Sequence, residues 1–367
     1  MAFGSHLLSH ADTLLLSQLR ISNLRNLSDL SFEPQPGINL ILGDNGAGKT
    51  SVLEAIHMLS MGRSFRTRSL KSAVKFGQQQ IQIVAKTSKN IPLGLQYSHS
   101  NGLTIRLNSA PLKRLSELAI QLPMQFIPAN CHQFFEQGPR YRRRILDWGL
   151  FHVEPSFNFH WQSYKKILQQ RNSALRQHKK IDEIQVWDNH LAEHGETITA
   201  LRKSQLECLL EEFKKVFSQI CPDYKEADFS IKYRSGWLKG ESLLQSLTKA
   251  IERDRHLGYT RSGSHAADWS FRINELDPFE VFSRGQQKLF FLALCMAQAK
   301  ITEQNSHEKT ILLLDDISSE LDSHHQNNVL SELAKLPAQV FITATDFELE
   351  PNSDVAVFHV KQGHLGE

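Results

Sequence analysis

The sequence predicts an α/β fold that is interrupted by an inserted α-helical lobe. Near the start, a short apolar run at residues 38–42 is followed by a glycine-rich turn and then by apolar residues at helical spacing over 51–61. From about 148 to 220 the chain is helical in pattern and poor in glycine and proline. Apolar strands and helices alternate again after residue 282. A chain of 367 residues has room for two such parts.

Composition excludes several classes of protein. The formal charge of +3 is only mildly basic, so any binding of nucleic acid must rest on local patches. No run of eighteen apolar residues is present, and we expect no membrane span. The four cysteines are far apart and form no Cys-x-x-Cys pair, which favours a reducing cytoplasm over a disulfide framework or structural zinc. Residues 1–12 are expected to be a flexible extension and not a secretory signal.

The N-terminal part of the α/β frame is expected to contain both kinds of sheet. Residues 13–32 alternate loosely, which indicates a β-hairpin leading to the strand at 38–42. Further antiparallel strands are expected after the first helix, and one more short strand is closed by Pro128; these lie at 81–84, 93–97, 103–107 and 124–127.

The character of the chain changes near residue 138. We therefore expect an α/β frame built from 13–138 and 271–367, with 139–270 as the inserted helical lobe. The stretch 253–270 is low in apolar residues and is expected to be a loop or hinge within that lobe. The frame resumes with alternating helices and strands, expected at 282–299, 310–314, 326–336, 340–343 and 355–360.

The glycine-rich turn fits the phosphate-loop pattern, in which Gly, four other residues and Gly-Lys-Thr stand between a strand and a helix. Its residues are Gly43, Asp44, Asn45, Gly46, Ala47, Gly48, Lys49, Thr50 and Ser51. Such a loop curls backbone N–H groups around phosphates at a helix N-terminus. Lys49 is expected to neutralise phosphate oxygens, and the Thr50 hydroxyl to ligate Mg²⁺.

A second motif is an apolar strand that ends in two carboxylates, Asp315 and Asp316. Asp315 is expected to hold Mg²⁺, and Asp316 to orient or deprotonate an attacking water. The alternative is a strand followed by an ordinary helix cap. The phosphate loop upstream favours the catalytic interpretation, because each motif predicts the other.

A third motif heads a helix shortly before that strand and comprises Ser283, Arg284, Gly285 and Gln286. A serine hydroxyl and a helix N-terminus can bind a phosphate. A single chain already has its phosphate loop, so this second phosphate-binding motif would have no obvious role within the same chain. We therefore expect this motif to cap the γ-phosphate held by a second copy of the chain. The alternative is a well-capped helix start. After the carboxylates, the segment from Ser319 to Asp322 is typical of a D-loop that crosses such a dimer interface.

This order of motifs resembles that of the ABC-type ATPases, and within them the RecF family of the SMC/Rad50/RecF group. The insertion is short and lacks the Cys-x-x-Cys pair of Rad50. The resemblance runs over nearly the whole chain from Leu14. Matching segments lie at 62–67, 138–143, 147–148, 154–155, 170–176, 283–286, 315–316 and 319–322. Residues 263–268 depart from the usual Gly-Pro-His-Arg/Lys segment, whereas Thr343 at the switch position is in keeping with the family.

The resemblance implies an ABC-ATPase-like P-loop NTPase head with an inserted helical lobe. It also implies an ATP-dependent homodimer that closes on DNA, a slow DNA-stimulated ATPase reaction, and RecO and RecR as partners in recombinase loading, SOS induction and replication restart. Asp316 is one methylene shorter than the glutamate of related ATPases, which favours slow hydrolysis.

Basic clusters are the candidate DNA contacts, because lysine and arginine bind phosphates without reading bases. They comprise Arg63, Arg66, Arg140, Arg142, Arg143, Arg144, Lys165 and Lys166. The alternative is a set of solvated helix faces, and Arg142 and Arg143 could instead hold the start of the lobe together. Two other functions remain open: a stand-alone transporter nucleotide-binding subunit, and an ATP-gated scaffold that binds protein only.

Overall fold

The computed structural model describes residues 14–347 and 354–366, which form two compact units. Unit 1 comprises the described residues up to Cys131, residues 216–223 and the chain from Arg284 onward. Unit 2 comprises residues 132–215 and 224–283. The predicted extension 1–12 lies outside the described residues. In the ranges that the structure describes, no helix combines the length and apolarity needed to cross a bilayer.

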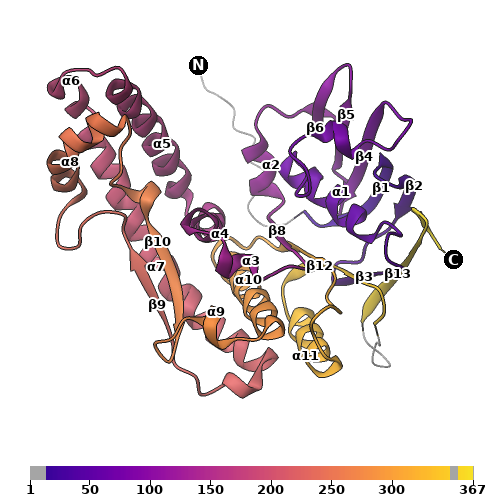
Figure 1. Ribbon diagram of the computed structural model, residues 1–367. Helices are drawn as coiled ribbons and strands as arrows, with labels where there is room; N and C mark the ends of the chain where they lie inside the picture. The colour runs from indigo at the N-terminus through magenta and orange to yellow at the C-terminus, as the bar shows by residue number, and fades with distance from the viewer. Residues whose placement is uncertain (1–13, 348–353, 367) are drawn as a thin grey trace. The chain divides into compact units, whose positions relative to one another are not determined.

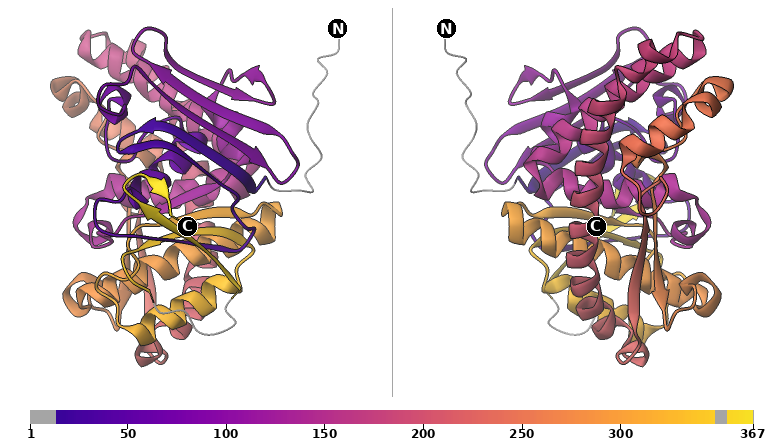
Figure 2. Two further views of the ribbon diagram at one scale, coloured as in Figure 1. Left: turned by 90° about the vertical axis from the view of Figure 1, so that its right-hand side faces the viewer. Right: turned by 90° about the vertical axis from the view of Figure 1, so that its left-hand side faces the viewer.

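One sheet of unit 1 is antiparallel, and its long strands are visible in both views of Figure 2. In spatial order it contains β2 (Leu27–Phe32), β1 (Leu16–Leu24), β4 (Gln80–Thr87), β5 (Pro92–Ser98), β6 (Gly102–Leu107) and β7 (Ala110–Pro111). Side chains of β4 alternate between buried and exposed, as expected for a sheet with one face on the core. The predicted hairpin and the three antiparallel strands are confirmed.

The other sheet of unit 1 has a parallel core. In order it contains β14 (His364–Leu365), β13 (Val355–Lys361), β3 (Ile38–Leu42), β12 (Ala338–Ala344), β11 (Thr310–Leu314) and β8 (Met124–Ile127), and only the β13–β14 pair is antiparallel. Every residue of β11 and β12 is buried, as expected for parallel strands covered on both faces. The five parallel strands end at one edge, where ligands of open α/β sheets bind.

Helices cover both faces of the parallel sheet (Figure 1). Helix α1 (Lys49–Met61) lies between the two sheets, and nearly all of its residues are buried. Helices α10 (Arg284–Ser306) and α11 (Ser323–Ala334) lie on the opposite face. Unit 1 also contains η1 (Leu70–Ala73) and α2 (Leu115–Gln121). The helices predicted at 282–299 and 326–336 are confirmed with shifted ends.

Unit 2 is mostly helical. It contains α3 (Gln133–Glu136), α4 (Pro139–Val153), α5 (Pro155–Arg176), α6 (Ile181–Gln185), α8 (Leu243–Leu257), η3 (Ser264–Ala266) and α9 (Pro278–Val281). Helix α7 (Asp188–Ile220) is one continuous helix of 33 residues, which corresponds to about 50 Å. The last residues of α7, from Val216 onward, belong to unit 1. The chain then forms η2 (Pro222–Tyr224).

Two expectations for the insertion need correction. Residues 253–270 are a loop only in part, at 258–267: α8 continues to Leu257, and β10 (Asp268–Ile273) pairs with β9 (Phe229–Arg234) as an antiparallel ladder. The last turn of α8 looked like a loop because it is charged, yet its Asp254 is fully buried. The insertion is therefore not purely helical. The compact units also divide the chain at 131/132 and 283/284, whereas 138 and 271 were predicted.

Candidate nucleotide-binding site

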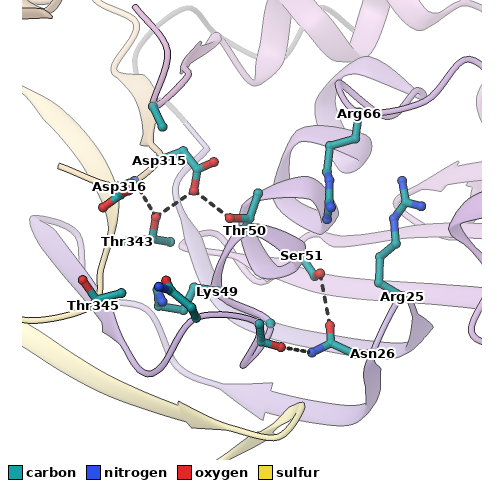
Figure 3. A pocket seen from close by; sticks show the side chains of 14 residues that line it. Arg25, Asn26, Lys49, Thr50, Ser51, Arg66, Asp315, Asp316, Thr343 and Thr345 are labelled. Atoms are coloured by element: carbon teal, nitrogen blue, oxygen red, sulfur yellow. Dashed lines mark hydrogen bonds between the residues drawn. The ribbon is translucent and has the colours of Figure 1, made fainter. Parts of the chain in front are cut away.

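A cavity of about 450 Å³ opens at the carboxyl edge of the parallel sheet, entirely within unit 1 (Figure 3). This volume is in the usual range for small-molecule sites. It is lined by Arg25, Asn26, Asn45, Gly46, Gly48, Lys49, Thr50, Ser51, Arg66, Ala129, Asp315, Asp316, Thr343 and Thr345. The predicted loop residues Gly43, Asp44 and Ala47 do not line it.

The loop before α1 requires glycine at two positions. At Gly43, with φ of 155°, an added Cβ would lie 2.2 Å from the Val360 carbonyl oxygen. At Gly48, with φ of 118°, it would lie 2.7 Å from the Leu27 side chain. Gly48 is also the N-cap of α1. The first N–H groups of a helix have no partner within it, so this helix start presents donors to a phosphate in the cavity.

Lys49 is folded back over its own loop. Its Nζ donates to the Gly43 oxygen at 2.6 Å and to the Asp44 oxygen at 3.0 Å. Burial lowers the pKa of Lys49, and the carboxylates of Asp316, Asp315 and Asp44 oppose that shift. The ammonium group is therefore held by neutral carbonyls beside a cavity, where an anion would bind it more strongly.

A hydroxyl–carboxylate network joins the phosphate loop to the end of β11 (Figure 3). Thr50 Oγ1 donates to Asp315 Oδ1 at 2.8 Å, and Thr343 Oγ1 donates to the same oxygen at 2.9 Å. The Asp316 N–H donates to Thr343 Oγ1 at 2.8 Å. Thr343 thus orients both carboxylate residues, a role that the sequence did not indicate.

The donor set fits a magnesium ion better than a transition metal. Thr50 and Asp315 supply hydroxyl and carboxylate oxygens that already lie within hydrogen-bonding distance of each other. Mg²⁺ prefers one or two protein oxygens, completed by water and substrate phosphates. The described residues contain no group of three or more His, Cys, Asp or Glu side chains that could hold a metal by themselves.

Two arginines on the other side of the cavity were not predicted as nucleotide contacts (Figure 3). Arg25 pairs with the fully buried Glu54 through two hydrogen bonds of 2.8 and 3.0 Å. Arg66 lies 3.6 Å from the same carboxylate, which also accepts a hydrogen bond from Ser64. Two guanidinium groups against one carboxylate leave this side of the cavity positive. Of the two arginines, Arg66 lies in a segment that carries the family resemblance, at 62–67.

The predicted signature and D-loop residues lie around the start of α10. Ser283 and Arg284 are exposed, whereas Gly285 packs so closely that an added Cβ would lie 2.5 Å from the Glu320 oxygen. Asp322 accepts the His325 N–H at 2.8 Å and caps α11, and this contact lowers the pKa of its carboxyl. Among the unit 1 residues of the two motifs, namely Arg284, Gly285, Gln286, Ser319 and Asp322, none lines the cavity.

The candidate DNA contacts separate into three environments. Arg63, Arg140, Arg144, Lys165 and Lys166 are exposed. Inside unit 2, Arg142 donates twice to Asp268 at 3.0 Å, and Arg143 donates to the Ala267 oxygen. These contacts favour a structural role for both residues, the alternative kept open from the sequence. Arg66 lines the nucleotide cavity.

Comparison with known protein families gives one match over most of the chain. The family model described as "RecF/RecN/SMC N terminal domain" matches residues 15–365. The "DNA replication and repair protein RecF" of Nitrosococcus oceani is 37% identical over 96% of this chain and 99% of that protein. The RecF proteins of Shewanella pealeana and Pseudoalteromonas translucida are also 37% identical, over 95% of this chain and 98% and 99% of theirs.

Two solved structures are similar over nearly the whole chain. The recombination mediator protein RecF-ATP of the RecFOR pathway gives a TM-score of 0.82 at 28% identity and covers 98% of this chain and 99% of that one. The RecF-ATPrS structure gives 0.81 at 29% identity, with coverage of 97% and 99%. An Smc head bound to the C-winged helix domain of ScpA, 13% identical with a TM-score of 0.60 over 95% of both chains, shares the fold alone.

Proposed function

Because this chain belongs to the RecF family of DNA replication and repair proteins, we propose that it is an ATP-dependent switch of recombinational repair. The chain binds ATP, closes with a second copy on DNA, and opens after slow hydrolysis. The main support is the single cavity that brings Lys49 and Thr50 together with Asp315 and Asp316.

Binding of the triphosphate follows from the donors around the cavity. The N-terminal N–H groups of α1 bind phosphate oxygens, and Lys49 exchanges two loop carbonyls for the β- and γ-phosphates. Arg25 and Arg66 add positive charge on the opposite side. Mg²⁺, held by Thr50 and Asp315, supplies charge neutralisation at the phosphates when bound.

Hydrolysis needs a group that orients the attacking water, and Asp316 is that group in this proposal. Its main chain is fixed by Thr343, and its carboxylate accepts a hydrogen bond from Ser318 at 3.2 Å. The carboxylate can accept a proton from water as the γ-phosphate leaves. The short aspartate side chain reaches less far than a glutamate, which favours slow turnover, and DNA stimulates the reaction by stabilising the closed dimer.

The dimer arises because each cavity lacks a lid that a second chain can supply. Ser283 is exposed at the start of α10, and the N–H groups of that helix start bind the γ-phosphate held by the other copy. The segment from Ser319 to Asp322 crosses the same interface. ATP therefore joins two heads, and loss of the bridging phosphate lets them separate.

DNA and partner proteins complete the proposal. Exposed Arg63, Arg140, Arg144, Lys165 and Lys166 are available to backbone phosphates. RecR and RecO are the expected partners, in line with the RecFOR pathway named for the similar solved structures. The protein acts in the cytoplasm, where bacterial DNA lies, in recombinase loading at gaps, SOS induction and replication restart.

Light scattering tests the dimer directly. With Mg-ATP, or with a non-hydrolysable analogue, the wild type is expected to double its molar mass. Ser283→Arg should bind nucleotide normally yet remain a monomer, because the added side chain blocks the partner's phosphate. Gln304→Arg, exposed near the other end of α10, is the matched control and should dimerise. A wild type that stays monomeric at saturation contradicts the proposal.

DNA affinity with and without ATP, at two salt concentrations, separates the alternatives. A repair switch gains affinity with ATP, and that affinity falls as salt rises because counterions are released. A transporter subunit or a scaffold that binds protein only shows no gain with ATP.

A further inference from the structure

A buried lysine on α10 holds the loop that follows the Asp315–Asp316 pair. Lys288 is 2% exposed. Its Nζ donates to the Asp316 oxygen at 2.6 Å, the Ser319 oxygen at 2.7 Å and Ser319 Oγ at 2.8 Å. An ammonium group has three donors, and all three are used by this one loop. A lysine is rarely so deeply buried, because desolvating its charge is costly.

The loop that Lys288 holds has an unusual backbone. Asp316 and Glu320 have φ of 51° and 68°, the left-handed region that residues other than glycine seldom adopt. Such a conformation persists only where surrounding contacts impose it. At Asp316 both main-chain groups are held: the N–H donates to Thr343, and the carbonyl oxygen accepts from Lys288 and from Ser319 Oγ at 3.0 Å. Ser319 Oγ is itself an acceptor of Lys288, so the direction of the Asp316 carboxylate depends on Lys288 both directly and through Ser319.

A second contact links the same helix to the same loop. Gly285 packs against the Glu320 carbonyl oxygen, where an added Cβ would lie only 2.5 Å away. Gly285 and Lys288 are three residues apart on α10, so they lie on one face of the helix. This first turn of α10 is also the part that meets the other copy's phosphate under the proposed function. One short stretch of helix thus has two neighbours, the partner's nucleotide and its own catalytic loop.

We propose that Lys288 is a positioning residue that ties the start of α10 to Asp316 of its own chain. When α10 docks on the nucleotide of the partner, Lys288 carries that displacement to the Asp316–Glu320 loop and sets the carboxylate for hydrolysis in its own cavity. Each site in the dimer is thereby readied by occupancy of the other. This inference rests on the proposed function and adds to it a route of communication between the two sites.

The first test separates positioning from binding. Lys288→Met keeps the length and apolar stem of the side chain but removes all three hydrogen bonds. We expect kcat to fall about 10- to 100-fold, as for a misplacement of roughly 1 Å. KM, nucleotide affinity and ATP-dependent dimerisation should stay within about twofold, because no binding group has changed. Lys300→Met, at the other lysine of α10, is the control and should retain wild-type kcat.

A milder variant covers the case in which Lys288→Met does not fold. Ser319→Ala removes one of the three acceptors of Lys288, together with the hydrogen bond that Ser319 Oγ donates to the Asp316 oxygen, and leaves both carbonyl contacts of Lys288. A smaller fall in kcat with unchanged KM supports the proposal. Unchanged kcat in either folded variant, or a loss of nucleotide affinity equal to the loss of kcat, overturns it.

The second test asks in which chain Lys288 acts. Lys288→Met protein is mixed with a tenfold excess of Asp316→Asn protein and ATP, so that nearly all Lys288→Met chains sit in mixed dimers. In these dimers the Lys288→Met chain keeps its own Asp316 and receives an intact signature helix from its partner. If Lys288 positions Asp316 of its own chain, hydrolysis does not recover.

Recovery of hydrolysis in the mixed dimer means that Lys288 acts on the partner's site, which overturns the proposal. Failure of the proposed function itself has a different signature. In that case the wild type shows no ATP-dependent dimer by light scattering, and no mixed species forms.

Discussion

Two buried cations, one in each unit, are held in opposite ways. In unit 2, Arg171 donates to Asp188 at 2.7 Å and to Asp254 at 2.9 Å, so its charge is balanced within the protein. In unit 1, Lys49 has only neutral carbonyls as hydrogen-bond acceptors, and the described residues place it in no ion pair within 4 Å. Buried charge that the protein balances supports the fold, whereas buried charge that it leaves to neutral dipoles beside a cavity marks a ligand site.

The largest expected effect on stability comes from removing Arg171, the cation that pairs with Asp188 and Asp254. Arg171→Met should destabilise unit 2 by about 3–5 kcal/mol, because it leaves Asp188 and Asp254 buried without their cation. Burial already raises the pKa of Asp188 in spite of Arg171. All five tryptophans lie in unit 2, so the tryptophan fluorescence of a urea titration reports on that unit.

Nucleotide affinity of the same variant is the informative second measurement. Where the variant is still folded, ATP binding should be unchanged, since the cavity lies within unit 1. The control is Lys179→Met, whose exposed pair with Glu183 at 3.6 Å contributes less than about 1 kcal/mol. A similar loss of stability in both variants would contradict the role of Arg171 as a balanced, fold-supporting charge.

Local patterns made unit 1 largely predictable from the sequence. The phosphate loop and the strand ending in Asp315 are contiguous motifs, and their strands and helices were found because apolar spacing is visible within a short window. The roles of Arg25 and Thr343 could not be predicted in this way. Arg25 meets Glu54 across 29 positions, and Thr343 meets Asp315 across 28, and no local rule specifies such pairs.

The same limit explains the insertion. Helices α5 and α7 show clear helical periodicity, but β9 pairs with β10 across α8, so no tight turn joins the two strands. The sequence could not decide whether Arg142 binds DNA phosphates or holds the lobe together, because its partner Asp268 is 126 positions away. A basic cluster in a sequence therefore gives candidates for phosphate binding, and only the fold shows which of them are already paired.

An intermediate effect distinguishes two arginines that are close in sequence. Arg66 lines the cavity, whereas exposed Arg63 does not. Arg66→Ala should weaken ATP binding about tenfold, the loss of roughly 1.4 kcal/mol expected for one charge-assisted contact. Arg63→Ala should leave ATP affinity unchanged and lower the salt dependence of DNA binding by about one phosphate contact. Calorimetry measures the ATP affinity of both variants, and DNA affinity at several salt concentrations measures their phosphate contacts. If Arg63→Ala weakens ATP binding and Arg66→Ala does not, Arg66 is not part of the nucleotide site.

The smallest expected effect concerns the stability of unit 2 at acid pH, which should depend on His265 in the segment 263–268. His265 Nε2 lies 3.0 Å from the Thr260 carbonyl oxygen and must donate to it, so Nδ1 accepts the Tyr164 hydroxyl at 2.7 Å. Burial, with the charges of Arg143 and Arg171, lowers the pKa of His265, while the Thr260 contact and Asp254 oppose that shift.

Because the folded pKa of His265 lies below the unfolded value, its contribution to stability is complete above about pH 6.5. That contribution is lost as the pH falls toward the folded pKa, since the unfolded state then binds the extra proton. His265→Gln can keep both hydrogen bonds, through its amide N–H and oxygen, but cannot titrate. Urea midpoints from tryptophan fluorescence at about pH 7.5 and about pH 5.5 should therefore fall further for the wild type than for His265→Gln. If the urea midpoints of wild type and His265→Gln fall equally, protonation of His265 does not contribute to the acid sensitivity of unit 2.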